Sequence, residues 1–426
     1  MQKSGLNMKN KLLLTALLSL PVFGNDICKT NSNELISQLV TNHPSIKMSQ
    51  EIIQGAKERV DSAFWGFFPT PSIDVSAKDN DRNVAVARLD QPIWTGGKLT
   101  SKYDIANSKE EENIFELQET SYKLIENFFS VLESYEQSKA NIVELQEGLN
   151  NLNKFDDMID RRMDAGVSSN SDKDLLNARI EQINSDMIMA KNRYKVAMLQ
   201  LELMLDVKLS CDVSLNNILV TNTTNIESSI DRLLNFHPTI KKLNIQIQTK
   251  KYELDYTKAS IMPNLSLRAE HREGDLYNDN YNKSNDQDLV YMTFTATTNA
   301  GLSVMSDIAA ARVKINEIEY LKKSSEKELI DKILSDYNSY EIAKNRVKIL
   351  NSSISSAQNV LESYTRLFLA GKRQWLDLVN ASKELMQYKI ELANLLVSKD
   401  ILAYKLALKN GQIDLLNGEI KWYMKI

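Results

Sequence analysis

The sequence predicts a mainly α-helical protein with a membrane β component, in which long coiled-coil hairpins continue into four strands of membrane-spanning length. Three observations lead to this fold class. The chain repeats one pattern of elements, each repeat contains a long stretch with helical periodicity, and each repeat carries two short runs of alternating residues. Only 13 of the 426 residues are glycine and 7 are proline, which favours long regular elements.

The first 24 residues predict a secretory signal peptide. Lys9 and Lys11 precede an apolar run that begins at Leu12, and Gly24 marks the expected cleavage point. No later run reaches the ~18 consecutive apolar residues of a transmembrane helix. We therefore expect an exported chain, located in the periplasm, outside the cell or in the outer membrane of a Gram-negative bacterium. The formal net charge of −4 gives no basic surface for nucleic acid.

The chain contains an internal duplication. The dipeptide at His43-Pro44 recurs at His237-Pro238, 194 residues later, and the segment DLLNA at 174–178 recurs as DLVNA at 377–381, 203 residues later. A repeat of this length is much longer than a solenoid unit. The sequence therefore predicts two copies of one structural repeat.

The repeat divides the chain as follows. A signal peptide (1–24) precedes the first repeat (25–208), a linker (209–225), the second repeat (226–410) and a C-terminal tail (411–426), within one integrated domain. Each repeat is expected to contain a helix, two strands and a long helical hairpin. The initial helices are predicted to begin near Asn31 and Thr224, each with a glutamate three residues later, which is a capping-box spacing.

Four runs alternate with the period of two that is typical of strands. They are PSIDVSA (71–77), NVAVARL (83–89), NLSLRAE (264–270) and VYMTFTA (290–296). With its flanking residues each run is about ten residues long, close to the ~9–11 that a tilted strand needs to cross an outer membrane. The smallest membrane barrels have about eight strands. The chain is therefore expected to oligomerise in order to complete a barrel.

The helical hairpins are predicted from periodicity and from two glycines. Apolar residues follow one another at alternating steps of three and four, as in a coiled-coil seam: Tyr340, Ala343, Val347, Leu350, Ile354, Ala357, Leu361, Tyr364 and Phe368. Residues 98–165 contain no proline and would span about 100 Å as one helix. Gly166 and Gly371 are the expected left-handed caps, and the return helices are predicted at 172–208 and 374–409.

The segment QPIWTGGKL superficially resembles a phosphate-binding loop. A P-loop requires a glycine where Pro92 stands and a serine or threonine where Leu99 stands, so nucleotide binding is not expected. The second repeat has TNAG at the corresponding place. We therefore interpret Gly96 and Gly97 as a joint between strand and helix, where positive φ angles are needed.

With the duplication, the HP…P pattern in both copies, QPIWTGGKL and LAGKRQWLDLVNASKEL, the chain resembles the TolC-type outer-membrane efflux protein family. The resemblance covers essentially the whole mature chain. It implies a homotrimer whose four strands per protomer complete a twelve-strand barrel, above an α-helical tunnel that crosses the periplasm. It also implies two partners, a periplasmic adaptor and an inner-membrane ABC or proton-driven pump.

The resemblance also implies a gate at the periplasmic tip of the tunnel. Carried over position by position, the gate arginine is Arg373, with Asp174 or the neighbouring Asp172 as its acidic partner, and Asp377 is the first aspartate of an acidic ring. Phe368 stands where family members have a tyrosine that donates a hydrogen bond.

At the next position of the family's acidic ring, Asn380 stands in place of a second aspartate, which predicts weaker cation binding.

The gate residues also have ordinary structural interpretations. Asp174 could simply complete a capping box with Ser171. Arg373 and Asp377 could form a helix-surface pair worth ~0.2–0.5 kcal/mol.

Three other groups of residues have competing interpretations. The aromatic run at Phe64–Phe68 suits either a membrane-interface girdle or packing against helices. The two histidines before proline, His43 and His237, are expected to have a capping or packing role rather than to bind metal. Cys28 and Cys211 are expected to form a disulfide in an exported chain, because in this family both regions lie near the middle of the tunnel.

The most probable function from sequence is therefore a duct for type I protein secretion in the outer membrane, in contact with its lipid. A drug-efflux duct is the alternative within the family, and a periplasmic adaptor is the alternative of another class. We find no nucleophile–base or metal-ligand constellation, and we expect neither an enzyme nor a cofactor.

Overall fold

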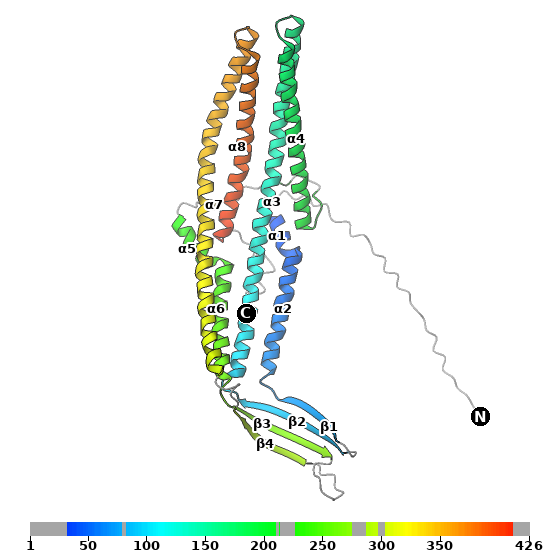
Figure 1. The fold of residues 1–426 in the computed structure, drawn as a ribbon, viewed down its shortest axis with the longest axis vertical. Helices are drawn as coiled ribbons and strands as arrows, with labels where there is room; N and C mark the ends of the chain where they lie inside the picture. Colours follow the sequence, from blue (N-terminus) through cyan, green and yellow to red (C-terminus); the bar gives the residue numbers. More distant parts are fainter. Residues whose placement is uncertain are drawn as a thin grey trace, which may run out of the picture.

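The computed structural model describes residues 32–78, 82–209, 213, 226–274, 287–296 and 303–411. Figure 1 shows an elongated molecule with a four-stranded sheet at one end and two helical turns at the other. In the first half of the chain the elements are α1 (Ser32–Asn42), α2 (Pro44–Trp65), β1 (Thr70–Lys78), β2 (Arg82–Trp94), α3 (Lys98–Asp164) and α4 (Asn170–Leu205). In the second half they are α5 (Ile226–Phe236), α6 (Pro238–Ala259), β3 (Asn264–Gly274), β4 (Gln287–Thr295), α7 (Ser303–Leu369) and α8 (Trp375–Lys409).

The two halves contain the same elements in the same order. Their first helices both have 11 residues, their second helices both have 22, and the long helices α3 and α7 both have 67. The return helices α4 and α8 have 36 and 35 residues. This equality is what a tandem duplication produces.

The recurring HP dipeptide begins the second helix of each half. The Nδ1 atom of His43 accepts a hydrogen bond from the backbone N–H of Ser45 (3.2 Å), and Nδ1 of His237 accepts one from Thr239 (3.3 Å). Proline follows at the first helical position, where its missing N–H removes no helical bond. The expected capping role of both histidines is confirmed.

Both hairpins turn at a glycine in the left-handed region. Gly166 has φ 72° and Gly371 has φ 70°. The N–H of Val167 bonds the carbonyl of Arg162 and the N–H of Lys372 bonds that of Leu367, both at 2.9 Å, as in a Schellman motif. The predicted seam residues of α7 are all buried or half-buried. The predicted coiled-coil hairpins are therefore confirmed.

The joint between sheet and helix uses two consecutive glycines. Gly96 has φ 61° and Gly97, the N-cap of α3, has φ 91°. A Cβ atom on Gly96 would lie 2.1 Å from Cβ of Met262, so the turn is also closely packed. The TGGK segment therefore changes the direction of the chain at the point where the sheet ends.

The four strands form one antiparallel sheet in the order β1-β2-β3-β4. β2 and β3 pair over Val84–Trp94, which joins the two repeats within one sheet. β2 is longer than the predicted 83–89, because the register shifts between Pro92 and Trp94 and so accommodates a proline without an N–H to donate. Among the described residues, one side of β1 and one side of β4 have no strand partner.

The helices pack side by side in two levels. Towards the turns the order is α4–α3–α8–α7, and towards the sheet it is α2–α3–α6–α7. The largest core lies where α1, α3, α4 and α8 meet, around Phe128, Phe129 and Tyr404. No helix in the described part of the chain is long and apolar enough to cross a membrane.

The first return helix differs from its predicted bounds at both ends, and several predictions concern residues outside the described ranges. The return helix predicted at 172–208 runs from Asn170 to Leu205, because Asp206 takes a left-handed conformation (φ 54°) and ends it. The signal peptide, Cys28, Cys211 and residues 412–426 lie outside the described residues, as do the capping positions Asn31 and Thr224.

Candidate functional site: the hairpin tips and the sheet

The tip of the second hairpin holds Arg373 against its own helices. Its Nη1 donates to Oδ2 of Asp377 (3.1 Å) and its Nη2 to the hydroxyl of Tyr364 (3.4 Å). The guanidinium also lies 4.4 Å from the centroid of the Tyr364 ring. Both charged side chains are partly exposed, so the pair stabilises the isolated hairpin only weakly.

The tip of the first hairpin is closed by a capping box. The backbone N–H of Asp172 donates to Oγ of Ser169 (3.3 Å), and Oδ2 of Asp172 accepts from the N–H of Ser169 (3.1 Å). The box suggested for Ser171 and Asp174 is wrong, because α4 begins two residues earlier and places Asp172 at the third helical position. Asp174, the fifth residue of α4, is exposed.

An aromatic cluster joins the two tips. Phe368 is buried, with its ring 5.3 Å from that of Trp375 and 4.5 Å from the guanidinium of Arg162. Arg162 also donates to the carbonyl of Phe368 (3.3 Å), and the indole N–H of Trp375 donates to the carbonyl of Asp172 (3.1 Å). The loops of both hairpins are thereby held together at one end of the molecule.

The sequence reasoning missed three residues at these tips. Tyr364 was assigned only to the apolar seam, yet it supplies a hydroxyl near Arg373, one helical turn before the phenylalanine that replaces the family's tyrosine. Arg162 could have been suspected as a basic residue in the last turn of α3. Nothing in the sequence indicated that Trp375 would bridge to the other hairpin.

The predicted gate residues therefore divide into two groups within one chain. Asp377 contacts Arg373, while among the described residues no ion pair joins Arg373 to Asp172 or Asp174. On the first tip, Nζ of Lys173 lies 2.6 Å from both Asp156 and Asp160, and these hydrogen bonds raise the pKa of Lys173. Within the described ranges, no group of three His, Cys, Asp or Glu side chains is placed to hold a metal ion.

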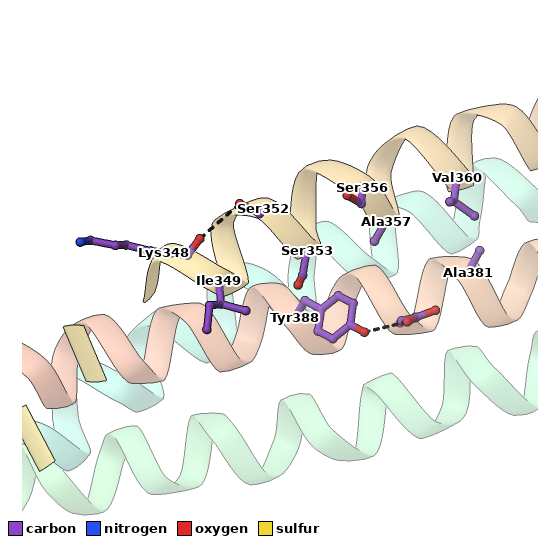
Figure 2. Close-up of a pocket in the computed structure, with 10 residues that line it drawn as sticks. Lys348, Ile349, Ser352, Ser353, Ser356, Ala357, Val360, Ala381 and Tyr388 are labelled. Atoms are coloured by element: carbon purple, nitrogen blue, oxygen red, sulfur yellow. Dashed lines mark hydrogen bonds between the residues drawn. The ribbon is translucent and has the colours of Figure 1, made fainter. Parts of the chain in front are cut away.

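A groove of about 620 Å³ runs along the second hairpin (Figure 2). Its α7 wall is formed by small or branched side chains, namely Ile349, Ser352, Ser353, Ser356, Ala357 and Val360. Its α8 wall includes Ala381 and Tyr388, whose hydroxyl donates to Glu384 (2.7 Å). The serines and alanines leave a depression beside larger apolar residues, a shape that accepts the side chains of another helix.

The two faces of the sheet differ sharply in chemistry. One face exposes mainly apolar side chains, namely Ile73, Val75, Leu267, Val290, Met292 and Phe294. Its charged or titratable residues, His271, Glu273 and Asp288, lie at the end of the strands away from the helices. The other carries charged residues in contact: Arg268 donates to Asp90 (2.6 Å), and Glu270 accepts from Arg88, Arg272 and Tyr291. This alternation is typical of a strand with lipid on one side and a polar lumen on the other.

Aromatic residues gather where α2 meets the sheet. Phe64, Trp65 and Phe68 are all exposed, and the rings of Phe64 and Trp65 lie 5.3 and 5.1 Å from that of Phe68. Exposure at the junction of sheet and helix favours the interface girdle over burial against helices.

The chain is similar in sequence to one named family and in fold to several solved channels. The profile of the family "Outer membrane efflux protein" matches residues 35–206 and 229–408. The outer-membrane protein VceC of Vibrio cholerae superposes with a TM-score of 0.77 at 14% identity, over 89% of this chain and 95% of VceC. The CmeC outer-membrane channel of Campylobacter jejuni superposes with a TM-score of 0.73 at 14% identity, over 92% of this chain and 88% of CmeC.

A partial sequence match covers about a third of a curated relative. It is 21% identical over 164 residues to the alkaline protease secretion protein AprF of Pseudomonas aeruginosa, which covers 38% of this chain and 34% of AprF. The duplicated hairpins, the sheet with one apolar and one charged face, and a family match over both repeats agree with one another. This chain belongs to the outer membrane efflux protein family, and it is located in the outer membrane and extends into the periplasm.

Proposed function

We propose that the chain is the exit duct of a type I protein secretion system, assembled as a homotrimer with a twelve-strand barrel and a helical tunnel. One observation carries the proposed assembly: within the described ranges, every level of the chain is an open layer with its free edges on the same two sides. The free elements are α4, α2 and β1 on the side of the first repeat, and α7 and β4 on the side of the second. Such a chain joins head to tail with further copies, and a closed ring removes all free edges.

The two outermost helices at the level of the turns, α4 and α7, expose apolar residues at similar distances from the turns. Met189 lies 19 residues from the first residue of α4, and Ile349 lies 20 residues from the last residue of α7; both are exposed. Val196 and Ile342 lie 26 and 27 residues from the same helix ends. At ~1.5 Å per residue, each pair is level to within a few ångströms, since both turns lie at the same end of the molecule (Figure 1).

The groove on the second hairpin lies between α7, the outermost helix on this side, and its neighbour α8. Ile349, Ser356 and Val360 line it, and the small side chains of Ser353 and Ser356 leave room for bulky neighbours. We infer that α4 of an adjacent copy occupies this groove, so that its apolar residues are no longer exposed to water.

The sheet supports the same assembly. Unpaired backbone groups in lipid cost several kcal/mol each, so the free edges of β1 and β4 must pair in the membrane. Pairing β4 of one chain with β1 of the next continues the sheet with its apolar face outward and its charged face inward. Three chains then give about twelve strands, above the minimum for a closed barrel.

Disulfide trapping tests the inferred interface. In a chain whose two native cysteines are replaced by serine, Met189→Cys combined with Ile349→Cys should give reductant-sensitive dimers and trimers in intact outer membranes. Met189→Cys combined with Val313→Cys is the matched control, because Val313 is an exposed α7 residue far from the turn. Absence of cross-linking in the first variant would refute the α4–α7 interface.

The type I cargo class rests on the distant similarity to AprF and on the segment GKRQWLDLVNASKEL. A drug-efflux duct is the second candidate, since the family profile that matches both repeats is that of outer membrane efflux proteins. Either function requires a periplasmic adaptor and an inner-membrane ABC or proton-driven pump as partners. We do not propose that this chain is itself a periplasmic adaptor, because this chain belongs to the family of the outer-membrane component.

Deleting the gene separates the two candidates. Type I secretion predicts that one or a few large proteins disappear from the culture supernatant and return on complementation, while sensitivity to small toxic compounds is unchanged. Increased sensitivity with an unaltered set of secreted proteins would instead assign the chain to efflux.

A further inference from the structure

Six charged side chains on the inward face of the sheet form a continuous network, which we call the charge belt: Asp74, Arg88, Asp90, Arg268, Glu270 and Arg272. Arg88 of β2 forms ion pairs with Asp74 of β1 and Glu270 of β3. The phenol of Tyr291 on β4 donates to Oε2 of Glu270 (2.7 Å). The belt thus links all four strands.

Glu270 is the centre of the belt. Its Oε1 accepts from Nε of Arg88 (3.2 Å) and from Nε of Arg272 (2.9 Å), and its side chain is only 1% exposed. The two arginines that cover it are 30% and 33% exposed. The carboxylate therefore lies beneath two guanidinium groups that form the accessible surface.

The belt is balanced in charge. It contains three arginines and three acidic residues, and Asp90 pairs with Arg268 through two hydrogen bonds of 2.6 and 3.2 Å. Among the described side chains of the strands, these residues are the charged ones on the inward face. A balanced and mutually paired ring presents little net potential to a passing polymer.

We propose that the charge belt keeps the part of the barrel wall that it lines electrically neutral, so that charged segments of cargo of either sign pass this level without binding, and that Glu270 is the residue that sets this neutrality. The proposal rests on the proposed trimeric duct. Without Glu270, each chain gains one positive charge and two guanidinium groups lose a shared partner. Three such chains would form a ring of arginines facing the lumen, which is suited to bind polyanions bidentately.

The test is block of single-channel current by inorganic tripolyphosphate added on the barrel side of a planar bilayer. Glu270→Gln should lower the half-blocking concentration by at least about tenfold relative to the parent chain. Glu273→Gln is the matched control. It removes the same charge from the same strand, but Glu273 is exposed on the opposite face and should leave the block unchanged.

A reciprocal variant guards against failure of Glu270→Gln to assemble. Arg272→Gln leaves one negative charge per chain and should produce block by hexaamminecobalt(III) from the same side, with no gain in block by tripolyphosphate. Equal block in Glu270→Gln and Glu273→Gln, or no cobalt block in Arg272→Gln, overturns the belt's role while leaving the duct intact. A parent chain that forms no channel refutes the proposed function itself.

Discussion

At the scale of single residues, the joint between sheet and helix depends on Gly96. Its φ of 61° and the close approach of Met262 both exclude a side chain. Gly96→Ala should lower the free energy of unfolding by at least about 2 kcal/mol, from left-handed strain and the clash together. Gly55→Ala is the control: it lies inside α2 with no atom within 4 Å of a new Cβ, and it should be neutral or stabilise by ~0.5–1 kcal/mol. Urea unfolding followed by circular dichroism measures both, and equal stabilities would contradict the assigned role.

His237 makes stability depend on pH. The pKa of His237 is lowered from 6.5 to about 4, chiefly by burial; the nearby Glu119 opposes this shift, and Lys409 and Lys332 contribute to it. The neutral ring is needed because Nδ1 accepts the N–H of Thr239. As the pH falls from 6.5 to 4, the unfolded chain binds a proton that the folded chain does not, so the free energy of unfolding should fall by up to about 3 kcal/mol.

A non-titrating cap isolates this contribution. Asparagine is a favoured N-cap residue, so His237→Asn should retain the helix start while removing this part of the pH dependence. Denaturant unfolding of the parent and variant at pH 7 and pH 5 gives the comparison. A parent and variant with the same loss of stability at pH 5 would show that another group titrates.

At the scale of elements, the hairpin tips combine weak contacts within a chain with free acidic groups on their surface. Arg373 is bound to Asp377 and Tyr364 in its own hairpin, whereas Asp174 is exposed on the first. We propose that Arg373 contacts Asp174 or Asp172 of an adjacent chain where the tips converge. Arg373→Ala should then raise single-channel conductance, with the open-to-closed ratio increasing about fivefold for each ~1 kcal/mol lost.

Two controls accompany the prediction for Arg373→Ala. Trimer assembly should be unchanged, because the pairs within the chain contribute only ~0.2–0.5 kcal/mol each. Lys372→Ala removes an adjacent cation at the same tip and should leave conductance as it is. If Arg373→Ala leaves conductance unaltered while an engineered disulfide across the tips blocks current, the gate exists but this arginine does not hold it.

The elements were largely predictable because each left a local signal. The three-four spacing from Tyr340 to Phe368, Gly166 and Gly371 as caps, and the alternation in NLSLRAE all reflect local backbone geometry. What could not be predicted depends on residues far apart in the sequence. The sequence around Glu270 does not indicate that Arg88, 182 residues away, would donate a hydrogen bond to its carboxylate. Likewise, the sequence around Trp375 does not indicate a hydrogen bond from its indole to the carbonyl of Asp172. The capping box was assigned to the wrong serine for a local reason. Ser169 and Ser171 are each followed three residues later by an aspartate, so the spacing alone does not distinguish them.

At the scale of the whole molecule, duplication explains the shape of the chain. Two equal repeats pair through β2 and β3 and through α3 with α6 and α8, which leaves the outermost elements of each repeat free. Exposed apolar residues on α4 and α7 lie at similar distances from the hairpin turns. An open layer of this kind is complete only in contact with copies of itself.

The number of chains in the native particle tests this account most directly. Extraction from outer membranes in a mild detergent, followed by native mass spectrometry, should give a particle of three chains, each derived from the 48.5 kDa sequence by removal of the signal peptide. Three chains are predicted because four strands per chain must close a barrel of about twelve. A stable, folded monomer from the outer membrane would contradict the account, since it would leave the edges of β1 and β4 unpaired in lipid.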